Sequence, residues 1–395
     1  MTSPSRTDLR IAAAFCGIVG LYDVVYATFT LSGGPVIGPI LNVLFPDFLV
    51  FWAATQAWLG GKLALVYTID PFTAYQNALY PDRFPNVVHF RPFFYPPVWL
   101  LMLLPFAWLG VATAYGVFMA ASVALATALQ GRLGWGWLAV VTSPAAVWVI
   151  LAGQNTFLSV ALFFGGFRLL ERSPAAAGIL LGLLSFKPQI WVLVPLALLA
   201  ARAWMAFAWM LASVAAISLA SLAVFGPDFW LAFLDSAREA ASPRVANEMF
   251  ERIFMHMTTL LAAARIVGLP PAVSGALQLA GSAFAVAAVW FAFRRPGDRE
   301  ARLAVLVTAT FLVSPYTLNY DLLLLMPAAV LMFRRAVEDG FFPLERLVLL
   351  ALWLVPTLGM VLNRLDLPVM PLIILAFGWF AWRRLGALKP AKHGA

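Results

Sequence analysis

The chain is divided into long apolar blocks joined by short, arginine-rich connections, and this pattern limits the folds that it can adopt. A helix needs about 20 apolar residues to cross a hydrocarbon core of ~30 Å, and the block at 11–31 has that length. Further blocks lie at 97–109, 112–130, 156–171, 175–187, 189–202, 204–225, 272–293, 301–314, 320–334, 345–362 and 368–383. Several are short for a span, so the sequence predicts about ten to twelve membrane-spanning helices.

Composition indicates a membrane protein rather than a soluble domain. Hydrophobic residues make up 63% of the chain and charged residues 11%, whereas soluble domains are about half apolar and about a quarter charged. The single cysteine, Cys16, excludes an intramolecular disulfide. We therefore expect an all-α, polytopic transmembrane helical bundle in which residues 1–395 form one integral membrane domain. The first block is expected to remain as a helix rather than to be cleaved as a signal.

The placement of arginines predicts the orientation of the bundle. With the N-terminus inside, the short inner connections collect Arg168, Arg172 and Arg202, and then the clusters at 294–302, 334–335 and 383–384. This is the distribution that the positive-inside rule describes. The net charge of +8 therefore reflects topology, and we expect no nucleic-acid partner.

One stretch does not fit a plain span. Residues 135–155 read WGWLAVVTSPAAVWVILAGQN, with Ser143-Pro144 in the middle. A full span here would invert every later segment and would turn the arginines outward. We expect instead a hairpin of two half-helices that enters from the outer face, since broken backbone is tolerated where protein or water satisfies it.

The same topology places two long loops, 32–96 and 226–270, on the outer side. Loops of this length within a tight bundle are usually functional or disordered, and these are rich in aromatic and apolar residues. In the first loop, residues 44–59 read LFPDFLVFWAATQAWL, which is too short to span and predicts an interfacial helix with Asp47 in its first turn. In the second we expect a short charged surface helix, followed by a segment at 257–267 on the membrane.

Polar side chains gather near the outer ends of the predicted spans. An unpaired ionic group in the bilayer centre costs on the order of 3 kcal/mol, so such groups are functional candidates by default. We expect them to line a polar cavity that opens outward beneath the two loops. This lining would comprise His89, Arg91, Tyr95, Gln154, Asn155, Lys187, Gln189, Asn319, Tyr320 and Asp321, with Asp47 beside them.

The motifs narrow the chemistry of such a cavity. The sequence has no His/Cys/Asp cluster with metal-ligand spacing, no glycine-rich phosphate loop and no serine-hydrolase signature. We therefore expect neither a metal nor a cofactor. Isolated carboxylates remain, together with the cations Lys187 and Arg91 and many aromatic residues. Such a set could deprotonate a hydroxyl and hold a phosphate whose hydrocarbon tail lies in the membrane.

The chain contains, in order, the blocks DFLVFWAATQAWLGGKLALVY, FRPFFYPPVWLLMLLPF, GQNTFLSVALFFGGFRLLERSPAAAGILLGLLSFKPQIWVLVPLALL and SPYTLNYDLLLL. Over about residues 45–335 it resembles glycosyltransferase family 87, bacterial GT-C-fold enzymes that include polyprenol-phosphate-mannose-dependent mannosyltransferases. The resemblance implies a GT-C-like bundle in the bacterial cytoplasmic (inner) membrane, with its site facing the periplasm or exterior. It also implies inverting transfer of mannose or another hexose from a polyprenyl-phosphate donor to a lipid or glycan hydroxyl.

The resemblance further implies roles for single residues. GT-C enzymes use an Asp or Glu in the first outer loop as the base, and Asp47 has that place. The departing phosphate of the donor needs cations, and Lys187 and Arg91 are the best placed. Similar mycobacterial enzymes have histidines near the last block, where this chain has Asn319-Tyr320-Asp321.

Each of these residues also has a purely structural alternative. Asp47 and Asp321 could only stabilise helix N-termini, and Lys187 could be a snorkelling lysine. The Gln-Asn pair at 154–155 could only cap the helix that follows. The basic residues near position 90 could make contacts within their own loop.

Other functions stay open on the sequence alone. A secondary transporter or lipid flippase would also place polar groups on broken helices, but it should show paired repeats and groups reached from both faces. A non-catalytic scaffold would not need Asp47 or Lys187. A polyprenyl diphosphate donor is a further alternative within the glycosyltransferases.

Overall fold

The computed structural model describes residues 46–79, 91–131, 133–134 and 136–386. Over these ranges the chain is helical, and its β-type pairing amounts to an isolated bridge between Met257 and Leu318. The all-α prediction is therefore confirmed for the described part of the chain. The predicted first span at 11–31 and His89 lie outside the described residues.

The helices follow one another with short connections. The first half contains α2 (Pro46–Leu59), η2 (Leu63–Leu65), α3 (Ile69–Leu79), α4 (Pro97–Leu103), η3 (Leu104–Phe106), α5 (Val111–Leu129), α6 (Gly136–Val141), α7 (Pro144–Ala152), α8 (Thr156–Leu169), α9 (Pro174–Leu183), η4 (Leu184–Phe186), α10 (Pro188–Trp191) and α11 (Val194–Ala200). The second half contains α12 (Trp204–Phe225), α13 (Pro227–Ala240), α14 (Pro243–Ile253), η5 (Phe254–His256), α15 (Leu260–Ile266), α16 (Pro271–Arg294), α17 (Arg299–Val313), η6 (Asn319–Leu324), α18 (Leu325–Asp339), α19 (Glu345–Arg364) and α20 (Met370–Leu385).

Every apolar block predicted from residue 97 onward coincides with one of these helices or with a broken pair of them. By length and composition, four described helices could cross a membrane, namely α5, α12, α16 and α19. Other blocks are shorter because they are interrupted. The block at 175–187 ends in η4, and the block at 189–202 is divided between α10 and α11. The polytopic membrane bundle is thus confirmed, although fewer helices than predicted span by length alone.

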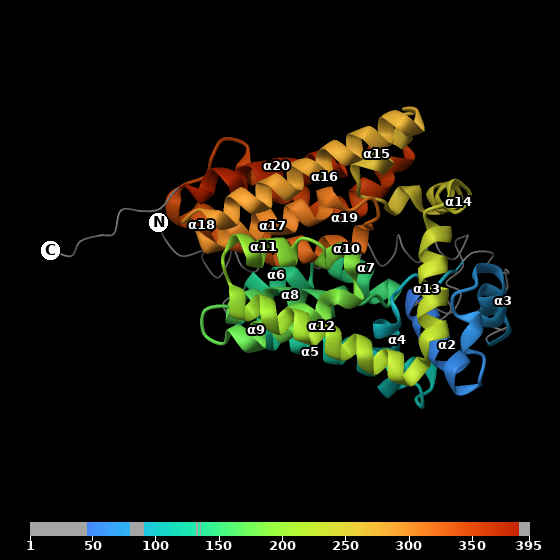
Figure 1. Ribbon diagram of the computed structural model, residues 1–395. Coiled ribbons are helices and arrows are strands. Elements are labelled where there is room, and N and C mark those ends of the chain that lie inside the picture. The colour runs from blue at the N-terminus through green and yellow to red at the C-terminus, as the bar shows by residue number, and fades with distance from the viewer. Residues whose placement is uncertain (1–45, 80–90, 132, 135, 387–395) are drawn as a thin grey trace.

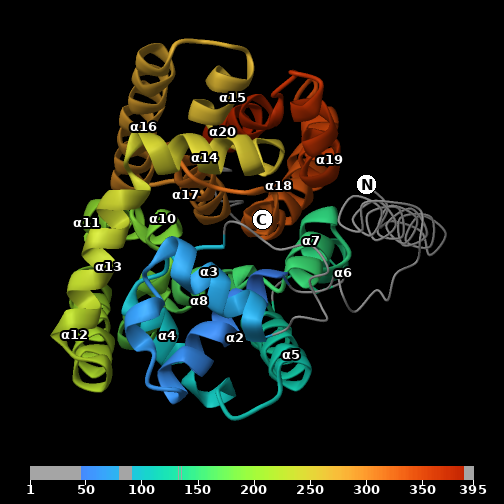
Figure 2. The ribbon, with the colours of Figure 1, turned by 90° about the vertical axis from the view of Figure 1, so that its right-hand side faces the viewer.

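The long helices form two neighbouring groups. Helices α5, α8, α9 and α12 pack together in one, and α16, α17, α18, α19 and α20 in the other, with α10 and α11 contacting the second group. Figure 1 shows the helices of both groups running along a common direction, and Figure 2 shows the groups side by side. The elements of the two predicted outer loops, α2–α3 and α13–α14, lie together at one end of this bundle (Figure 1).

The break predicted at Ser143-Pro144 is present, but the predicted hairpin is wrong, because α6 and α7 follow one another across the bundle, antiparallel to α5. Trp137 Nε1 of α6 donates to Thr127 Oγ1 near the end of α5 at 2.8 Å, and the hydroxyl of Tyr115 near the start of α5 donates to the carbonyl oxygen of Ile150 in α7 at 2.7 Å. The later helices keep their expected sides because the short block at 97–109 does not cross: it ends beside α2, where the carbonyl oxygen of Leu109 accepts from Trp52 Nε1 at 2.9 Å.

Helices α6 and α7 are separated at Ser143, whose hydroxyl accepts a hydrogen bond from the backbone N–H of Ala146 at 3.2 Å. Pro144 occupies the first turn of α7, a position that tolerates the missing N–H. At the other end, Gly153 adopts φ +73° and closes α7. This left-handed turn brings Gln154 and Asn155 directly to the start of α8.

The predicted helix around Asp47 is α2, but protein rather than lipid covers most of it. Phe48, Phe51 and Trp52 are all buried, as are the alanines that follow them in α2, at positions 53, 54 and 57. A helix that is apolar on all sides is expected in a core rather than on a surface. The absence of a polar face in the sequence of α2 therefore explains why the helix packs inside the bundle.

Helices α9 and α12 approach each other closely because glycines stand at their contact. A Cβ atom at Gly178 would lie 2.3 Å from the carbonyl oxygen of Ala206, and one at Gly182 would lie 2.6 Å from that of Met210. Small residues four apart allow this kind of backbone contact between helices in membranes. The backbone of α12 leaves no room for a side chain at either position.

We expect Gly178→Ala and Gly182→Ala each to destabilise the protein by about 1–3 kcal/mol, because the added methyl group would overpack the contact. Gly275→Ala in α16 is the matched control, since no described atom lies within 4 Å of its would-be Cβ. The control should keep or raise stability, because a helical glycine costs about 1 kcal/mol relative to alanine. Thermal unfolding in detergent measures these changes, and similar shifts in all three variants would contradict the close contact.

Candidate functional site

Gln154 is the centre of a polar cluster at the end of the bundle where α2 lies. Its Nε2 donates to Asp47 Oδ2 at 2.8 Å and to the hydroxyl of Tyr320 at 3.2 Å. Its Oε1 accepts a hydrogen bond from the hydroxyl of Tyr95 at 3.2 Å. The side chain therefore joins α2, η6 and the segment before α4, which are far apart in the sequence. An amide suits this position because it both donates and accepts.

A buried ion pair adjoins this cluster. Lys187 Nζ lies 2.5 Å from Asp321 Oδ1, and the two side chains are 1% and 2% exposed. The ammonium also donates to Asn155 Oδ1 at 3.0 Å and lies 3.5 Å from Thr156 Oγ1. The second carboxylate oxygen, Asp321 Oδ2, accepts from the backbone N–H of Leu318 at 3.1 Å. The pair is thus well supplied with the additional hydrogen bonds that a buried charge needs.

The ion pair and the Gln154 cluster meet at the start of α8. Gln154 and Asn155 are adjacent, and the backbone N–H of Asn155 donates to Gln154 Oε1 at 3.3 Å. The side chain of Asn155 is fully buried, and its Nδ2 has no hydrogen-bond partner among the described residues. A buried unpaired donor costs about 1–3 kcal/mol. An acceptor that enters the site would therefore be stabilised by this nitrogen.

Burial determines the acidity of Asp47. The residue keeps some exposed surface, but protein atoms surround its carboxyl group, and this desolvation raises its pKa above the ordinary value of 3.8. The hydrogen bond from Gln154 and the positive charges of Arg91 and Lys187 oppose that rise in pKa. The carboxyl group is therefore a stronger base than an exposed aspartate, while still having cations nearby.

Arg91 is held beside this carboxylate by the first loop. Its backbone N–H donates to Thr73 Oγ1 at 3.0 Å, and its carbonyl oxygen accepts from Gln76 Nε2 at 2.8 Å. Both partners belong to α3. Burial lowers the pKa of the half-buried guanidinium, and the charge of Asp47 raises it. Helix α3 thus positions a cation next to Asp47.

The second loop contributes a residue that the sequence did not single out. His256, in η5, lies 3.3 Å from Asn319 Oδ1 through its Nδ1 and packs edge-on against Trp148 of α7, with the ring centroids 5.9 Å apart. Burial lowers the pKa of His256 to about 4, so the ring is neutral near pH 7. No spacing or motif links these three residues, so sequence reasoning had no signal for the contact.

Most of the predicted site residues come together. Asp47, Tyr95, Gln154, Asn155, Lys187, Tyr320 and Asp321 form one network, with Arg91 beside it. Asn319 precedes Tyr320 in η6, but its side chain points to other partners: Oδ1 lies 3.3 Å from His256 Nδ1, and Nδ2 donates to the carbonyl oxygen of Pro356 in α19 at 3.3 Å. Gln189 is half-buried in α10, and its side chain makes no hydrogen bond to any described residue. His89 lies outside the described residues.

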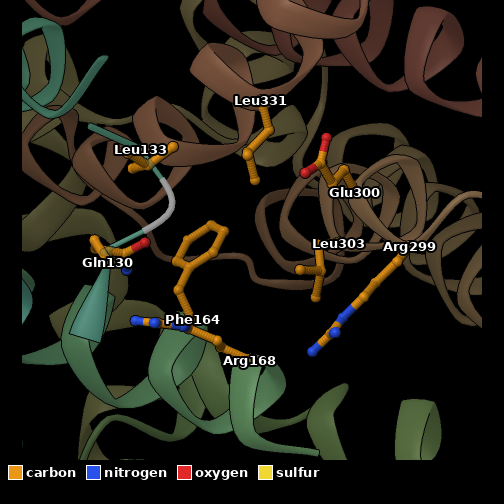
Figure 3. A pocket seen from close by; sticks show the side chains of 8 residues that line it. All are labelled: Gln130, Leu133, Phe164, Arg168, Arg299, Glu300, Leu303 and Leu331. Atoms are coloured by element: carbon orange, nitrogen blue, oxygen red, sulfur yellow. The ribbon is translucent and has the colours of Figure 1, made fainter. Parts of the chain in front are cut away.

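Two cavities among the described residues lie away from this cluster. One, of about 50 Å³, is lined by Gln130, Leu133, Phe164, Arg168, Arg299, Glu300, Leu303 and Leu331 (Figure 3). It adjoins the far ends of α5 and α8, away from the start of α8 where the polar cluster lies. Its charges are already engaged, because Arg168 donates to the carbonyl oxygen of Leu129 at 2.8 Å and Arg299 pairs with Glu171 at 3.5 Å. Among the described residues, no cluster of three or more His, Cys, Asp or Glu side chains could hold a metal ion.

We expect Lys187→Met and Asp321→Asn each to destabilise the protein by about 3–5 kcal/mol, because either change leaves the remaining member of the buried pair without its partner. The double variant Lys187→Met/Asp321→Leu should recover a large part of the loss, since it removes both charges. The exposed pair Arg238–Asp235 provides the control, and Arg238→Gln should change stability little. Thermal unfolding in detergent tests this, and additive losses in the double variant would contradict the coupling.

The sequence matches the model of a known protein family. The family model for glycosyltransferase family 87 matches residues 93–315, which is more than half of the chain. Neither a curated protein nor a solved structure matches. The matched range holds Tyr95, Gln154, Asn155 and Lys187, whereas Asp47 precedes it and Asp321 follows it. This match and the all-helical membrane architecture agree: the chain is a membrane glycosyltransferase and belongs to glycosyltransferase family 87.

Proposed function

We propose that the protein transfers a hexose, with mannose as the first choice, from a polyprenyl-phosphate carrier to a hydroxyl of a lipid or glycan. The observation that carries this proposal is a carboxylate beside a cation at the end of the bundle. Asp47 is oriented by Gln154 and lies near Arg91. A base and a cation are what this reaction requires, because a phosphate is already a competent leaving group.

The proposed reaction is a single displacement in a GT-C-like site. The Asp47 carboxylate accepts the proton of the acceptor hydroxyl as the oxygen of that hydroxyl forms a bond to the anomeric carbon. The bond between that carbon and the phosphate oxygen breaks, and the polyprenyl phosphate leaves with the electron pair. Attack from the side opposite the phosphate inverts the anomeric centre, and Asp47 holds the proton until solvent removes it.

The two cations take different parts in this proposal. Lys187 is buried and its ammonium already meets Asp321, Asn155 and Thr156. Direct contact with a phosphate would require it to give up one of these partners. Arg91 is half-buried and close to Asp47, so it is the better candidate for direct contact with the donor phosphate. Lys187 would then act by fixing Asn155, whose unpaired Nδ2 can donate to an oxygen of the donor.

The arrangement also supports an orientation. The polar cluster lies at the end of the bundle that carries both long loops, and the arginine-rich connections lie at the other end. Under the positive-inside rule, the cluster then faces the periplasm or exterior of a bacterial inner membrane. A lipid-linked donor would reach it with its hydrocarbon tail still in the bilayer.

We expect Asp47→Asn to lower the transfer rate by about 100- to 10,000-fold, the range typical of a lost general base. The variant should remain folded, because an amide oxygen can still accept from Gln154. The raised pKa means that the unfolded chain loses its proton at lower pH than the folded protein, so ionised Asp47 costs stability at neutral pH. The apparent melting temperature of Asp47→Asn should therefore equal or exceed that of the wild type.

The assay combines the purified protein with several polyprenyl-phosphate hexoses and with a membrane-lipid extract as the source of acceptor. Asp70→Asn serves as the matched control, because Asp70 is an exposed acid in the first turn of α3. Equal transfer by the wild type and Asp47→Asn would remove Asp47 as the base. Solute uptake into proteoliposomes, without sugar transfer, would favour a transporter instead.

The pH dependence of transfer provides a separate prediction. Transfer should fall as the pH drops through the pKa of Asp47, because the protonated acid cannot accept the hydroxyl proton. Arg91 lowers that pKa, so Arg91→Gln should move the acid limb of the rate profile to higher pH. Arg91→Lys keeps the charge and should leave the limb near its original position. A limb that does not move in Arg91→Gln would contradict the coupling between the two side chains.

A further inference from the structure

Arg202 occupies a backbone position that arginine does not favour. It connects α11 to α12 with φ +55°, in the left-handed region. Its N–H donates to the carbonyl oxygen of Leu199 at 3.0 Å, and the next N–H, of Ala203, donates to that of Leu198 at 2.9 Å. This is the pattern of a helix C-cap, at which glycine is the common residue because a Cβ atom is crowded there. The chain nevertheless places a long cationic side chain at this position.

The side chain of Arg202 borders a hollow of about 270 Å³. The rest of the lining is formed by apolar residues, Leu170, Pro174, Ala203, Trp204, Met205 and Ala206. Trp204 and Met205 are 61% and 60% exposed, so the hollow continues into an apolar surface of α12. Arg202 is itself exposed, and its guanidinium forms no hydrogen bond or ion pair with any described residue.

The hollow lies at the end of the bundle opposite the polar cluster. Helix α8 begins beside Gln154 and ends next to Leu170, which lines the hollow. Helix α12 begins at the hollow, and Phe225 at its other end packs against Trp58 of α2 with ring centroids 6.4 Å apart. Since α12 is long and apolar enough to span, the hollow stands at a membrane–water boundary.

We propose that this hollow binds the headgroup of an anionic phospholipid from the leaflet opposite the polar cluster. The phosphate would accept hydrogen bonds from the Arg202 guanidinium, whose planar fork matches phosphate oxygens. An acyl chain would lie along Trp204 and Met205, and tryptophan is the residue that prefers the headgroup depth. The volume is slightly below the ~300–1,000 Å³ of ordinary ligand pockets, which suits a headgroup rather than a whole lipid.

Comparison with the smaller cavity of Figure 3 supports this choice. There, the arginines are engaged by backbone carbonyl oxygens and by Glu171, and the carboxylate of Glu300 also lines the cavity. The hollow beside Arg202 contains a cation but no carboxylate among its lining residues. An anion is therefore the ligand that its charge complements.

The test uses Arg202→Gly, because this change should raise the stability of the lipid-free protein while it weakens the binding of anionic phospholipid. Glycine relieves the left-handed position, so the apparent melting temperature of the lipid-free protein in detergent should rise. Binding of phosphatidylglycerol, counted by native mass spectrometry, should become roughly fivefold weaker, the loss typical of one basic residue at an anionic membrane. Stabilisation by added phosphatidylglycerol should be lost to the same extent.

Two further variants act as controls. Leu344 also has a left-handed backbone, with φ +66°, and is 71% exposed without a charge. Leu344→Gly should therefore raise the melting temperature and keep wild-type lipid binding. Arg202→Lys should bind more tightly than Arg202→Gly because it retains the positive charge, but less tightly than the wild type because it lacks the planar fork.

Phosphatidylcholine and inorganic phosphate complete the design. Neither should reproduce the effect of phosphatidylglycerol on the wild type, since the first lacks net charge and the second lacks the acyl chain. Wild-type binding of phosphatidylglycerol by Arg202→Gly would overturn the proposal. Equal stabilisation by phosphatidylcholine, or by inorganic phosphate, would overturn it as well.

Discussion

The buried contact between Lys187 and Asp321 is the interaction on which the polar end of the bundle depends. It joins the break between η4 and α10 to the start of η6, and it occurs where both side chains are almost fully enclosed. Replacing such a pair with apolar residues is often neutral for stability, whereas removing one partner is costly. Its value to this protein is therefore geometric, because it fixes two interrupted helices in one arrangement and holds Asn155 and Thr156 between them.

The remaining site follows from that arrangement. The left-handed turn at Gly153 presents Gln154 to Asp47 on one side, and Asn155 to the ion pair on the other. Asp47 is thus oriented by residues that are themselves fixed, which is the condition for a base to act at a set distance. The unfavourable burial of an ionised Asp47 is a cost in stability that a purely structural helix cap would not require.

Sequence reasoning could identify the members of the site but not their contacts. Lys187 and Asp321 stood out because lipid excludes unpaired charge, and this physical rule applies whatever the fold. That they pair with each other, rather than each with a ligand, depends on how the chain folds between two residues that lie 134 positions apart. The contact of His256 with Asn319 and Trp148 likewise joins three distant segments. Local patterns of hydrophobicity carry no information about such pairings.

Local sequence patterns were enough to predict the membrane class, the helical segments, the proline break at 143–144 and the gathering of polar residues at one end of the bundle. These properties follow from local hydrophobicity and from the backbone preferences of proline and glycine, which act over a few residues. Other features required the folded arrangement: α2 is covered by protein, Gln154 links Asp47 to two tyrosines, and Lys187 is neutralised while Arg202 faces a hollow. Each of these depends on which surfaces meet, and packing of whole helices, rather than any short stretch, selects those surfaces.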